Sequence, residues 1–267
     1  AGAFYSLAVT LLVNTSRLTG VEYDLAKHRV RVGAATRWDD LIGPLSERGF
    51  AALHGSSPTV GVVGYSLGGG IGWLSRKHGL QASAVTAIEL VTAEGHLVRT
   101  DAVHEPELFW ALRGGNGNFG IVTALEFRVH PVAELYAGAM FFPAERSGEV
   151  LRTWSGLLPS LPEELTTWAS IVHVPPMPEI PAPLQGRSLV AVMGVFLGSE
   201  QDGRTLLQPL RALGPEIDLF GLQPPAGIAD LAMDPATPLP MRSTGATLSR
   251  LPDSTVYAQT GLLAHQH

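Results

Sequence analysis

Short runs of β-branched and apolar residues recur along the first half of the chain and predict strands. They lie at residues 11–14, 29–32, 85–92, 96–99 and 120–130. The first of these runs predicts a strand that extends over residues 10–15. The sequence AEGH, residues 93–96, separates two of the runs, so we expect a tight hairpin turn there.

Apolar residues spaced three and four apart predict amphipathic helices between the strands. Trp38, Leu41 and Leu45 mark one helix over residues 38–48, which Gly49 closes. A shorter helix is predicted over residues 105–112, where the following glycines stop it.

Prolines become frequent after Pro131, which we take as the boundary between two domains, residues 1–131 and 132–267. The second region has strand-like runs at 137–142, 167–174 and 189–197, and helical runs at 145–158 and 200–213. This order of elements predicts an α+β domain with a mainly antiparallel sheet.

The composition excludes several classes of function. The 267 residues are 45% hydrophobic and 16% charged, which is enough for a large buried core. A net charge of −6 without a basic stripe argues against nucleic acid as a partner. The apolar runs are shorter than the roughly 18–20 residues of a membrane helix, so we expect no membrane partner. The absence of cysteine excludes disulfides, thiolate metal sites and a cysteine nucleophile.

Neither end of the sequence resembles the natural end of a protein. The chain starts without methionine or a basic leader, which makes it a poor signal peptide, and GLLAHQH ends without a turn or a polar tail. We therefore expect a piece of a longer protein, with a cytoplasmic location as the default.

The stretch VVGYSLGGGIGW, residues 62–73, contains a match to G-x-S-x-G, the nucleophile elbow of α/β-hydrolases, centred on Ser66. Residues 60–63 and 71–77 could supply the strand and the helix that an elbow requires, and Asp101 and His104 follow. However, three glycines directly after the elbow would weaken that helix by about 1 kcal/mol each relative to alanine. Repeated strand–helix alternation is also missing. A serine hydrolase using Ser66 is therefore an alternative, not the favoured interpretation.

The same stretch can instead form a cradle for a cofactor, because glycines point backbone N–H groups into a concavity with no Cβ in the way. Nearby hydroxyl donors are Ser56, Ser57, Thr59 and Ser66. A second cluster, RGGNGNFG over residues 113–120, suggests another wall around an extended ligand. The simpler alternative is that both clusters are tight turns.

Three long motifs carry a resemblance to a known family: PTVGVVGYSLGGGIGWLSRKHGL, IELVTAEGHLV and ELFWALRGGNGNFGIVTALEFRVHPV. They resemble the FAD-linked oxidases of the berberine bridge enzyme-like family, closely over residues 9–132 and more loosely to residue 251. The resemblance implies an α+β fold. It consists of a flavin domain of the p-cresol methylhydroxylase/vanillyl-alcohol oxidase type, which binds extended FAD, and a substrate domain whose sheet covers the isoalloxazine. It also implies that Ser66 lies in an FAD loop and is no nucleophile.

Carried over position by position, the resemblance places residues 55–61 beside the isoalloxazine and ribityl chain, 64–70 at the ribityl and diphosphate, and 120–122 at the adenosine. The predicted FAD contacts are Gly55, Ser56, Ser57, Pro58, Thr59, Val60, Gly61, Gly64, Tyr65, Ser66, Gly68, Gly69, Gly70, Gly72, Gly120, Ile121 and Val122.

Two departures from the family concern covalent attachment of the flavin. Many members use a cysteine where this chain has Ser57, so a cysteinyl bond is impossible here. Others use a histidine in an Arg-Ser-Gly-Gly-His loop, which would precede Ala1. The family's last flavin-domain segment and part of its substrate sheet would follow His267. We therefore expect residues 1–267 alone to hold FAD weakly.

Some conspicuous residues favour structural roles. His78 is expected in a turn capped by Gly79, and Trp110 is expected to pack with Phe109 in a helix core. A surface or capping role is favoured for Arg113.

Residues near the two ends offer little chemistry. The pair His265 and His267 lacks carboxylate support, so no metal site is predicted. Tyr5 could face the flavin ring.

These features together predict an FAD-dependent oxidoreductase. In the family, a small organic substrate gives a hydride to flavin N5 and molecular oxygen reoxidises the flavin. The protein supplies binding and orientation. The catalytic base and the substrate stay open, and a non-catalytic fragment that keeps the fold is the alternative from another class.

Overall fold

The computed structural model describes residues 12–176, 183–234, 245–249, 251 and 255. The chain forms two compact units, and each is made of separate stretches of sequence. The first unit comprises Ala1–Leu41, Thr59–Gly70 and Gln81–Val129. The second unit comprises Ile42–Pro58, Ile71–Leu80 and His130–His267.

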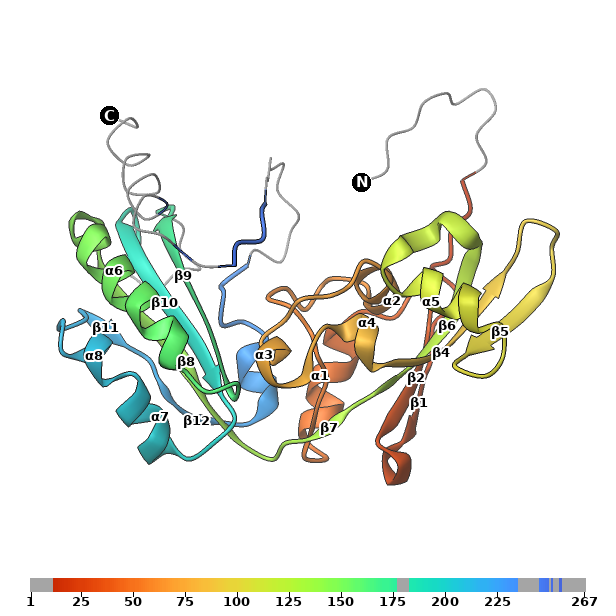
Figure 1. Ribbon diagram of the computed structural model, residues 1–267, viewed down its shortest axis with the longest axis horizontal. Coiled ribbons are helices and arrows are strands. Elements are labelled where there is room, and N and C mark those ends of the chain that lie inside the picture. Colours follow the sequence, from red (N-terminus) through yellow and green to blue (C-terminus); the bar gives the residue numbers. More distant parts are fainter. Residues whose placement is uncertain (1–11, 177–182, 235–244, 250, 252–254, 256–267) are drawn as a thin grey trace. The chain divides into compact units, whose positions relative to one another are not determined.

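The first unit is built on a five-stranded antiparallel sheet (Figure 1). Its strands, in spatial order, are β1 (Val21–Asp24), β2 (Arg29–Gly33), β6 (Ile121–Arg128), β4 (Val85–Val91) and β5 (Leu97–Asp101). Strands β4 and β5 form the predicted hairpin, in which Gly95 has a φ of 83° and the Thr92 N–H donates to His96 O.

One face of this sheet is apolar and carries short helices. Burial alternates along its strands, so Val32, Ile88 and Phe127 are fully buried. Helices α2 (Val62–Leu67) and α5 (Pro106–Gly115) pack on the sheet. The remaining elements of this part are η1 (Leu25–Lys27), α4 (Gln81–Ala84) and η2 (Asn116–Phe119), and α1 (Asp39–Ser46) spans the division between the units.

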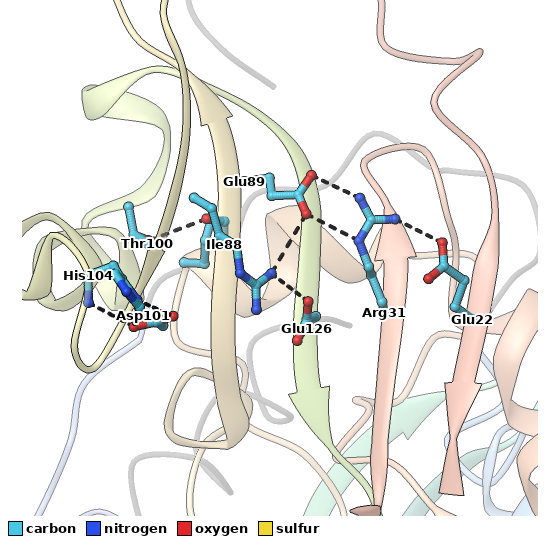
Figure 2. A network of polar contacts seen from close by, with 9 residues as sticks. Glu22, Arg31, Ile88, Glu89, Thr100, Asp101, His104 and Glu126 are labelled. Atoms are coloured by element: carbon cyan, nitrogen blue, oxygen red, sulfur yellow. Dashed lines mark hydrogen bonds and ion pairs between the residues drawn. The ribbon is translucent and has the colours of Figure 1, made fainter.

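The other face of the same sheet carries a row of charged side chains. Figure 2 shows Arg31 between Glu22 and Glu89, with distances of 3.2 Å and 2.9 Å between the paired atoms. Arg99 of β5 adds an ion pair at 2.5 Å to Glu126 of β6, across the intervening β4. These pairs are partly exposed, so their individual contribution to stability is small, and the row mainly keeps this face polar.

The second unit holds a second antiparallel sheet, with strand order β11-β8-β10-β9 and β12 also paired to β8. The strands are β8 (Leu135–Pro143), β9 (Leu165–His173), β10 (Ser188–Phe196), β11 (Ile217–Asp218) and β12 (Gly221–Gln223). Eight of the nine residues in β8 are buried, and so are eight of nine in β10.

Helix α6 (Ser147–Leu157) packs against β8, β9 and β10, and α7 (Glu200–Leu206) against β8 (Figure 1). Tyr136, Met140 and Phe142 of β8 form a core with Val150 and Leu151 of α6. The smaller elements of this unit are β3 (Phe50–Ala51), α3 (Ser75–His78), β7 (His130–Pro131), η3 (Ala144–Arg146), η4 (Leu158–Ser160), α8 (Gln208–Arg211) and η5 (Pro225–Ile228).

The predicted α+β class and the mainly antiparallel second sheet are confirmed. The strand predicted over residues 10–15 is wrong within its described part, because residues 12–15 lie in no strand. Leu12 is 74% exposed there, and the Ser16 N–H bonds to the Asn14 side chain, which favours a turn over pairing with a sheet.

Two further predictions differ in detail. The helix predicted over residues 200–213 breaks into α7 and α8 near Pro209, because proline lacks the N–H that would continue a helix. Strand β1 was not predicted; it is four residues long and only half-buried, which leaves little hydrophobic signal.

Candidate cofactor site

Helix α2 carries a face without side chains. Gly61, Gly64 and Gly68 are exposed and recur at spacings of three and four, so they share one side of the helix. A methyl group placed on Gly61 or Gly64 would have no neighbour within 4 Å. The opposite side buries Val62, Val63, Ser66 and Leu67. The helix therefore presents bare backbone to whatever approaches its outer face.

Strong local contacts hold α2 in place. The Val62 N–H donates to Thr36 O at 2.9 Å, and the Trp38 N–H donates to Val60 O at 3.1 Å. The ring of Tyr65 packs edge-on against the indole of Trp38, with ring centroids 5.6 Å apart. Burial raises the pKa of the Tyr65 phenol, so this hydroxyl stays protonated at neutral pH. The glycine face is thus held by a rigid, apolar support.

The turn after α2 requires glycine for the fold itself. Gly69 and Gly70 have φ values of 108° and 72°, in the region that favours glycine. A Cβ on Gly70 would lie 2.6 Å from the Tyr65 ring and 2.8 Å from Gln81 Cβ. The carbonyl oxygens of both glycines accept hydrogen bonds from α4, at 2.8 Å and 2.9 Å. The sequence Gly-Gly-Gly therefore serves a tight turn as well as any ligand.

The second glycine cluster leads into β6. Gly120 has a φ of 149°, and a Cβ there would lie 2.6 Å from Val91 O. Ile121 and Val122 are the first residues of β6 and pair with Val91 and Leu90 of β4. Ile121 is exposed, whereas Val122 is buried. Only Ile121 of these three offers an exposed side chain to a ligand.

Thr59 and Val60 belong to the first unit, where Thr59 is half-buried and Val60 is exposed, and the other remaining predicted contacts lie in the second unit. Gly55, Ser56, Ser57 and Pro58 are half-buried and follow the buried His54. Gly72 is buried, and its N–H donates to Ser75 Oγ at 2.7 Å. The division between the units falls between Pro58 and Thr59, so the predicted contacts come from both units.

His54 fixes the start of this segment. Its Nδ1 lies 2.8 Å from Gly55 O, and its own carbonyl accepts from the Trp73 N–H at 3.4 Å. Burial lowers the pKa of His54 to about 4, against the opposing effect of the hydrogen bond to Gly55. The imidazole is therefore neutral at pH 7, which identifies Nδ1–H as the donor in the bond to Gly55.

The geometry of Ser66 does not fit a nucleophile. It lies within α2 rather than between a strand and a helix, and residues 60 and 61 form no strand before it. Its side chain is fully buried, and Oγ donates to Val62 O at 2.7 Å. In the part of the chain that the structure describes, no histidine or carboxylate contacts this hydroxyl. The same bond occupies the hydrogen that Ser66 would need to donate to a diphosphate.

Other residues singled out from the sequence have clear positions. His78 ends α3, which Gly79 caps with a φ of 79°, as predicted, and its ring stacks on His130 with centroids 3.8 Å apart. Arg113 lies over the Phe109 ring at 4.3 Å. The core position predicted for Trp110 is wrong: it is 75% exposed, because Phe109 and Leu112 define the buried side of α5 and Trp110 points away from it.

Tyr5, His265 and His267 lie outside the described residues. Over the described ranges, no three potential ligands of the types His, Cys, Asp or Glu gather to hold a metal ion. Those ranges also contain no helix with the length and apolar character needed to cross a bilayer.

The glycine surface fits a large phosphorylated cofactor better than a small substrate. The open side of α2 allows close backbone approach over two turns, from Gly61 to Gly68. This geometry suits an extended ligand that packs closely against the helix, where the N–H groups of Val62, Tyr65 and Gly68 already donate to other carbonyls. Gly61 and Gly64, two of the residues predicted to bind FAD, therefore leave room for such a ligand.

Similarities to known proteins agree with this geometry. The FAD binding domain family matches residues 4–101. The FAD-linked oxidoreductase azaG of Aspergillus niger is 31% identical over 207 residues, which cover 77% of this chain and 42% of that protein.

Solved structures show the same relationship. BBE-like 1 of Physcomitrella patens matches with a TM-score of 0.66 and 26% identity, over 78% of this chain and 43% of that one. The xylooligosaccharide oxidase of Myceliophthora thermophila C1 also gives a TM-score of 0.66, with 28% identity over 82% of this chain and 46% of that one. The chain therefore spans less than half the length of each of these relatives.

Proposed function

We propose that this chain, a homologue of the FAD-linked oxidoreductases of the berberine bridge enzyme-like family, binds FAD and supports the oxidation of a small organic substrate. The observation that carries the proposal is the bare glycine face of α2, made of Gly61, Gly64 and Gly68. Gly64 lies inside the helix, whereas Gly61 and Gly68 cap it, and a surface helix without a functional reason to expose backbone would gain about 1 kcal/mol from alanine at the position of Gly64.

The predicted contacts fall into three segments with different roles in holding the cofactor. Residues 64–70 bring backbone to the ribityl chain and diphosphate, and residues 120–122 bring backbone to the adenosine. Residues 55–61 lie beside the ring. Backbone approach, not side-chain donation, dominates at α2, since the hydroxyl of Ser66 is already bonded to Val62 O.

When bound, FAD supplies hydride acceptance, and the protein supplies binding, orientation and exclusion of water. We propose molecular oxygen as the final electron acceptor. We place the start of the substrate domain after residue 131. We also propose a cytoplasmic location. A flavin joined to this chain through cysteine is excluded because the chain has none.

The test is the visible absorption spectrum of the purified protein, before and after dialysis. A flavin band that is released by denaturation and identified as FAD supports the cofactor assignment. Consumption of oxygen with a panel of alcohols, sugars and phenols then tests the oxidase activity. Gly64→Leu should lose flavin, because a large side chain fills the open face, whereas Ser66→Ala should keep it.

A colourless protein that does not take up added FAD would contradict the proposal. Flavin binding without turnover of any substrate would favour a non-catalytic protein that keeps the fold. Esterase turnover that disappears in Ser66→Ala would instead restore the hydrolase alternative.

A further inference from the structure

A hydrogen bond joins two side chains that lie 178 positions apart. Ser56 Oγ donates to Asp234 Oδ2 at 2.6 Å, and both residues belong to the second unit. Ser56 is half-buried and Asp234 is exposed, so a ligand can reach the pair. This contact brings a carboxylate to the segment that we propose to lie beside the flavin ring.

The direction of this bond determines what Ser56 can do next. An ionised carboxylate has no hydrogen to give, so the serine hydroxyl must be the donor. A hydroxyl has one hydrogen and two lone pairs, and its hydrogen is committed to Asp234. Ser56 can therefore only accept a further hydrogen bond, and the charge behind it strengthens the interaction.

The surroundings keep the carboxylate available. Among the described residues, no lysine, arginine or histidine forms an ion pair with Asp234. Met233, directly before it, has a φ of 55°, which costs energy for a residue other than glycine and persists only where the surrounding structure holds it. The Met233 N–H donates to Asp230 O at 2.9 Å and closes the turn that presents Asp234.

A second contact ties this turn to the same part of the chain as Ser56. The Ala226 N–H, in η5, donates to Ser46 Oγ at 3.1 Å, and η5 also contacts β3. The segment that ends at Asp234 therefore lies on residues 46–56 at more than one point. The Ser56–Asp234 bond is part of this packing, not an isolated surface contact.

We propose that Ser56 and Asp234 form an anionic hydrogen-bond acceptor at the ring end of the FAD site. The acceptor receives a hydrogen bond from one of two donors. One is the N3–H of the oxidised flavin ring, and the other is the hydroxyl group of a substrate. This inference rests on the proposed function, because only bound FAD brings the ring to residues 55–58. It predicts neutral, hydroxyl-bearing substrates and disfavours anionic ones.

Sulfite is the probe, because it is an anion that adds reversibly to oxidised flavin and bleaches its visible band. In Asp234→Asn, which is nearly isosteric, the dissociation constant for sulfite should fall about tenfold. A unit charge roughly 10 Å away at an effective dielectric constant of about 20 changes binding by approximately this factor. Asp230→Asn is the matched control, since it removes a charge of the same turn that does not contact Ser56, and it should change sulfite binding less than Asp234→Asn does.

Alkaline titration of the bound flavin distinguishes the two sources of the donor hydrogen. If Ser56 accepts from the ring N3–H, Ser56→Ala shifts the pH at which that group ionises. If Ser56 faces the substrate, the titration in Ser56→Ala matches the original protein, and reduction of the flavin by hydroxyl-bearing substrates slows instead. Either result supports the acceptor.

The outcome that overturns the inference is equal sulfite affinity in Asp234→Asn and the original protein while both hold stoichiometric FAD. In that case the proposed function stands and Asp234 lies away from the ring. A protein that binds no FAD at all overturns the proposed function, and the acceptor with it.

Discussion

The two glycine clusters of the first unit look alike in sequence but differ in what their glycines do. In the first cluster, residues 61–70, Gly61 and Gly64 face open space, whereas Gly70 is packed against Tyr65 and Gln81. In the second, residues 114–120, Gly114 and Gly117 also have open space around them, but Gly114 has a φ of 127°, and Gly115 and Gly120 each have a neighbour within 3 Å of where a Cβ would stand. Exposure of bare backbone on one helix face is therefore a property of the first cluster. The second is required mainly by the fold.

This difference teaches which glycines to change in order to separate folding from cofactor binding. A substitution at a packed glycine tests the fold, because clash and backbone strain act without any ligand. A substitution at an open glycine tests the ligand, because the free protein has room for the added methyl group.

The largest effect is expected for Gly120→Ala. The added Cβ would lie 2.6 Å from Val91 O, and φ is 149°. Strain and overpacking together should lower the free energy of unfolding by about 3 kcal/mol or more, as measured by urea denaturation. Gly95→Ala is the control, since Gly95 has a φ of 83° but open space around it, and it should cost about 1–2 kcal/mol. If the two variants lose the same free energy of unfolding, the contact with Val91 O does not contribute to the loss in Gly120→Ala.

A third glycine, Gly55, depends on the buried His54, which donates a hydrogen bond to its carbonyl oxygen. The free energy of unfolding should therefore depend on pH. The pKa of His54 falls from 6.5 in the unfolded chain to about 4 in the folded protein. The unfolded state therefore binds the proton first, and stability is lost as the pH falls from about 6.5 to about 4. The full loss is roughly 3 kcal/mol, by the usual 1.36 kcal/mol for each pKa unit.

Urea denaturation at several pH values between 4 and 7 measures this loss. His54→Gln should flatten the dependence, whereas substitution of the exposed His96 by glutamine should leave it as it is. If the free energy of unfolding of His54→Gln depends on pH as steeply as that of the original protein, other groups govern the loss in acid. His78 is one such group, because burial also lowers its pKa.

Gly64→Ala should move stability and cofactor binding in opposite directions. Alanine gains up to about 1 kcal/mol of helix propensity, and its methyl group meets no neighbour in the protein. The same methyl group keeps the backbone away from FAD, and one lost charge-assisted hydrogen bond weakens binding about tenfold or more.

Thermal unfolding without FAD and a fluorescence titration with FAD measure the two effects of Gly64→Ala. Gly43→Ala, in α1, is the matched control, because it also meets no neighbour but lies outside the predicted contacts. Unchanged FAD affinity in Gly64→Ala would place the cofactor away from this face of α2.

The smallest effect is expected for Ser66→Ala. The hydroxyl bonds to a carbonyl of its own helix, and removing it should change the free energy of unfolding by less than about 1 kcal/mol. FAD content should be unchanged. A complete loss of catalysis with full FAD content would give Ser66 the chemical role that its burial argues against.

The sequence predicted the long elements well because their signals are local. Residues 85–92 and 189–197 alternate or run apolar over enough positions to identify β4 and β10. Short elements failed for the opposite reason: β1 has only four half-buried residues, too few to give a clear hydrophobic pattern, although its partner β2 follows it directly in the chain. Trp110 was misplaced because an apolar side chain next to a buried one need not be buried itself.

By itself, the sequence determined the α+β class, the two glycine clusters, the absence of a thiol for flavin attachment and the resemblance to an FAD-linked family. Each of these depends on residue types in order along the chain. Only the tertiary structure decided which glycines face open space, that the Ser66 hydroxyl is consumed by Val62 O, and that Asp234 reaches Ser56. The physical reason is that accessibility and hydrogen-bond partners belong to the packed chain, where residues far apart in sequence compete for the same donors and the same space.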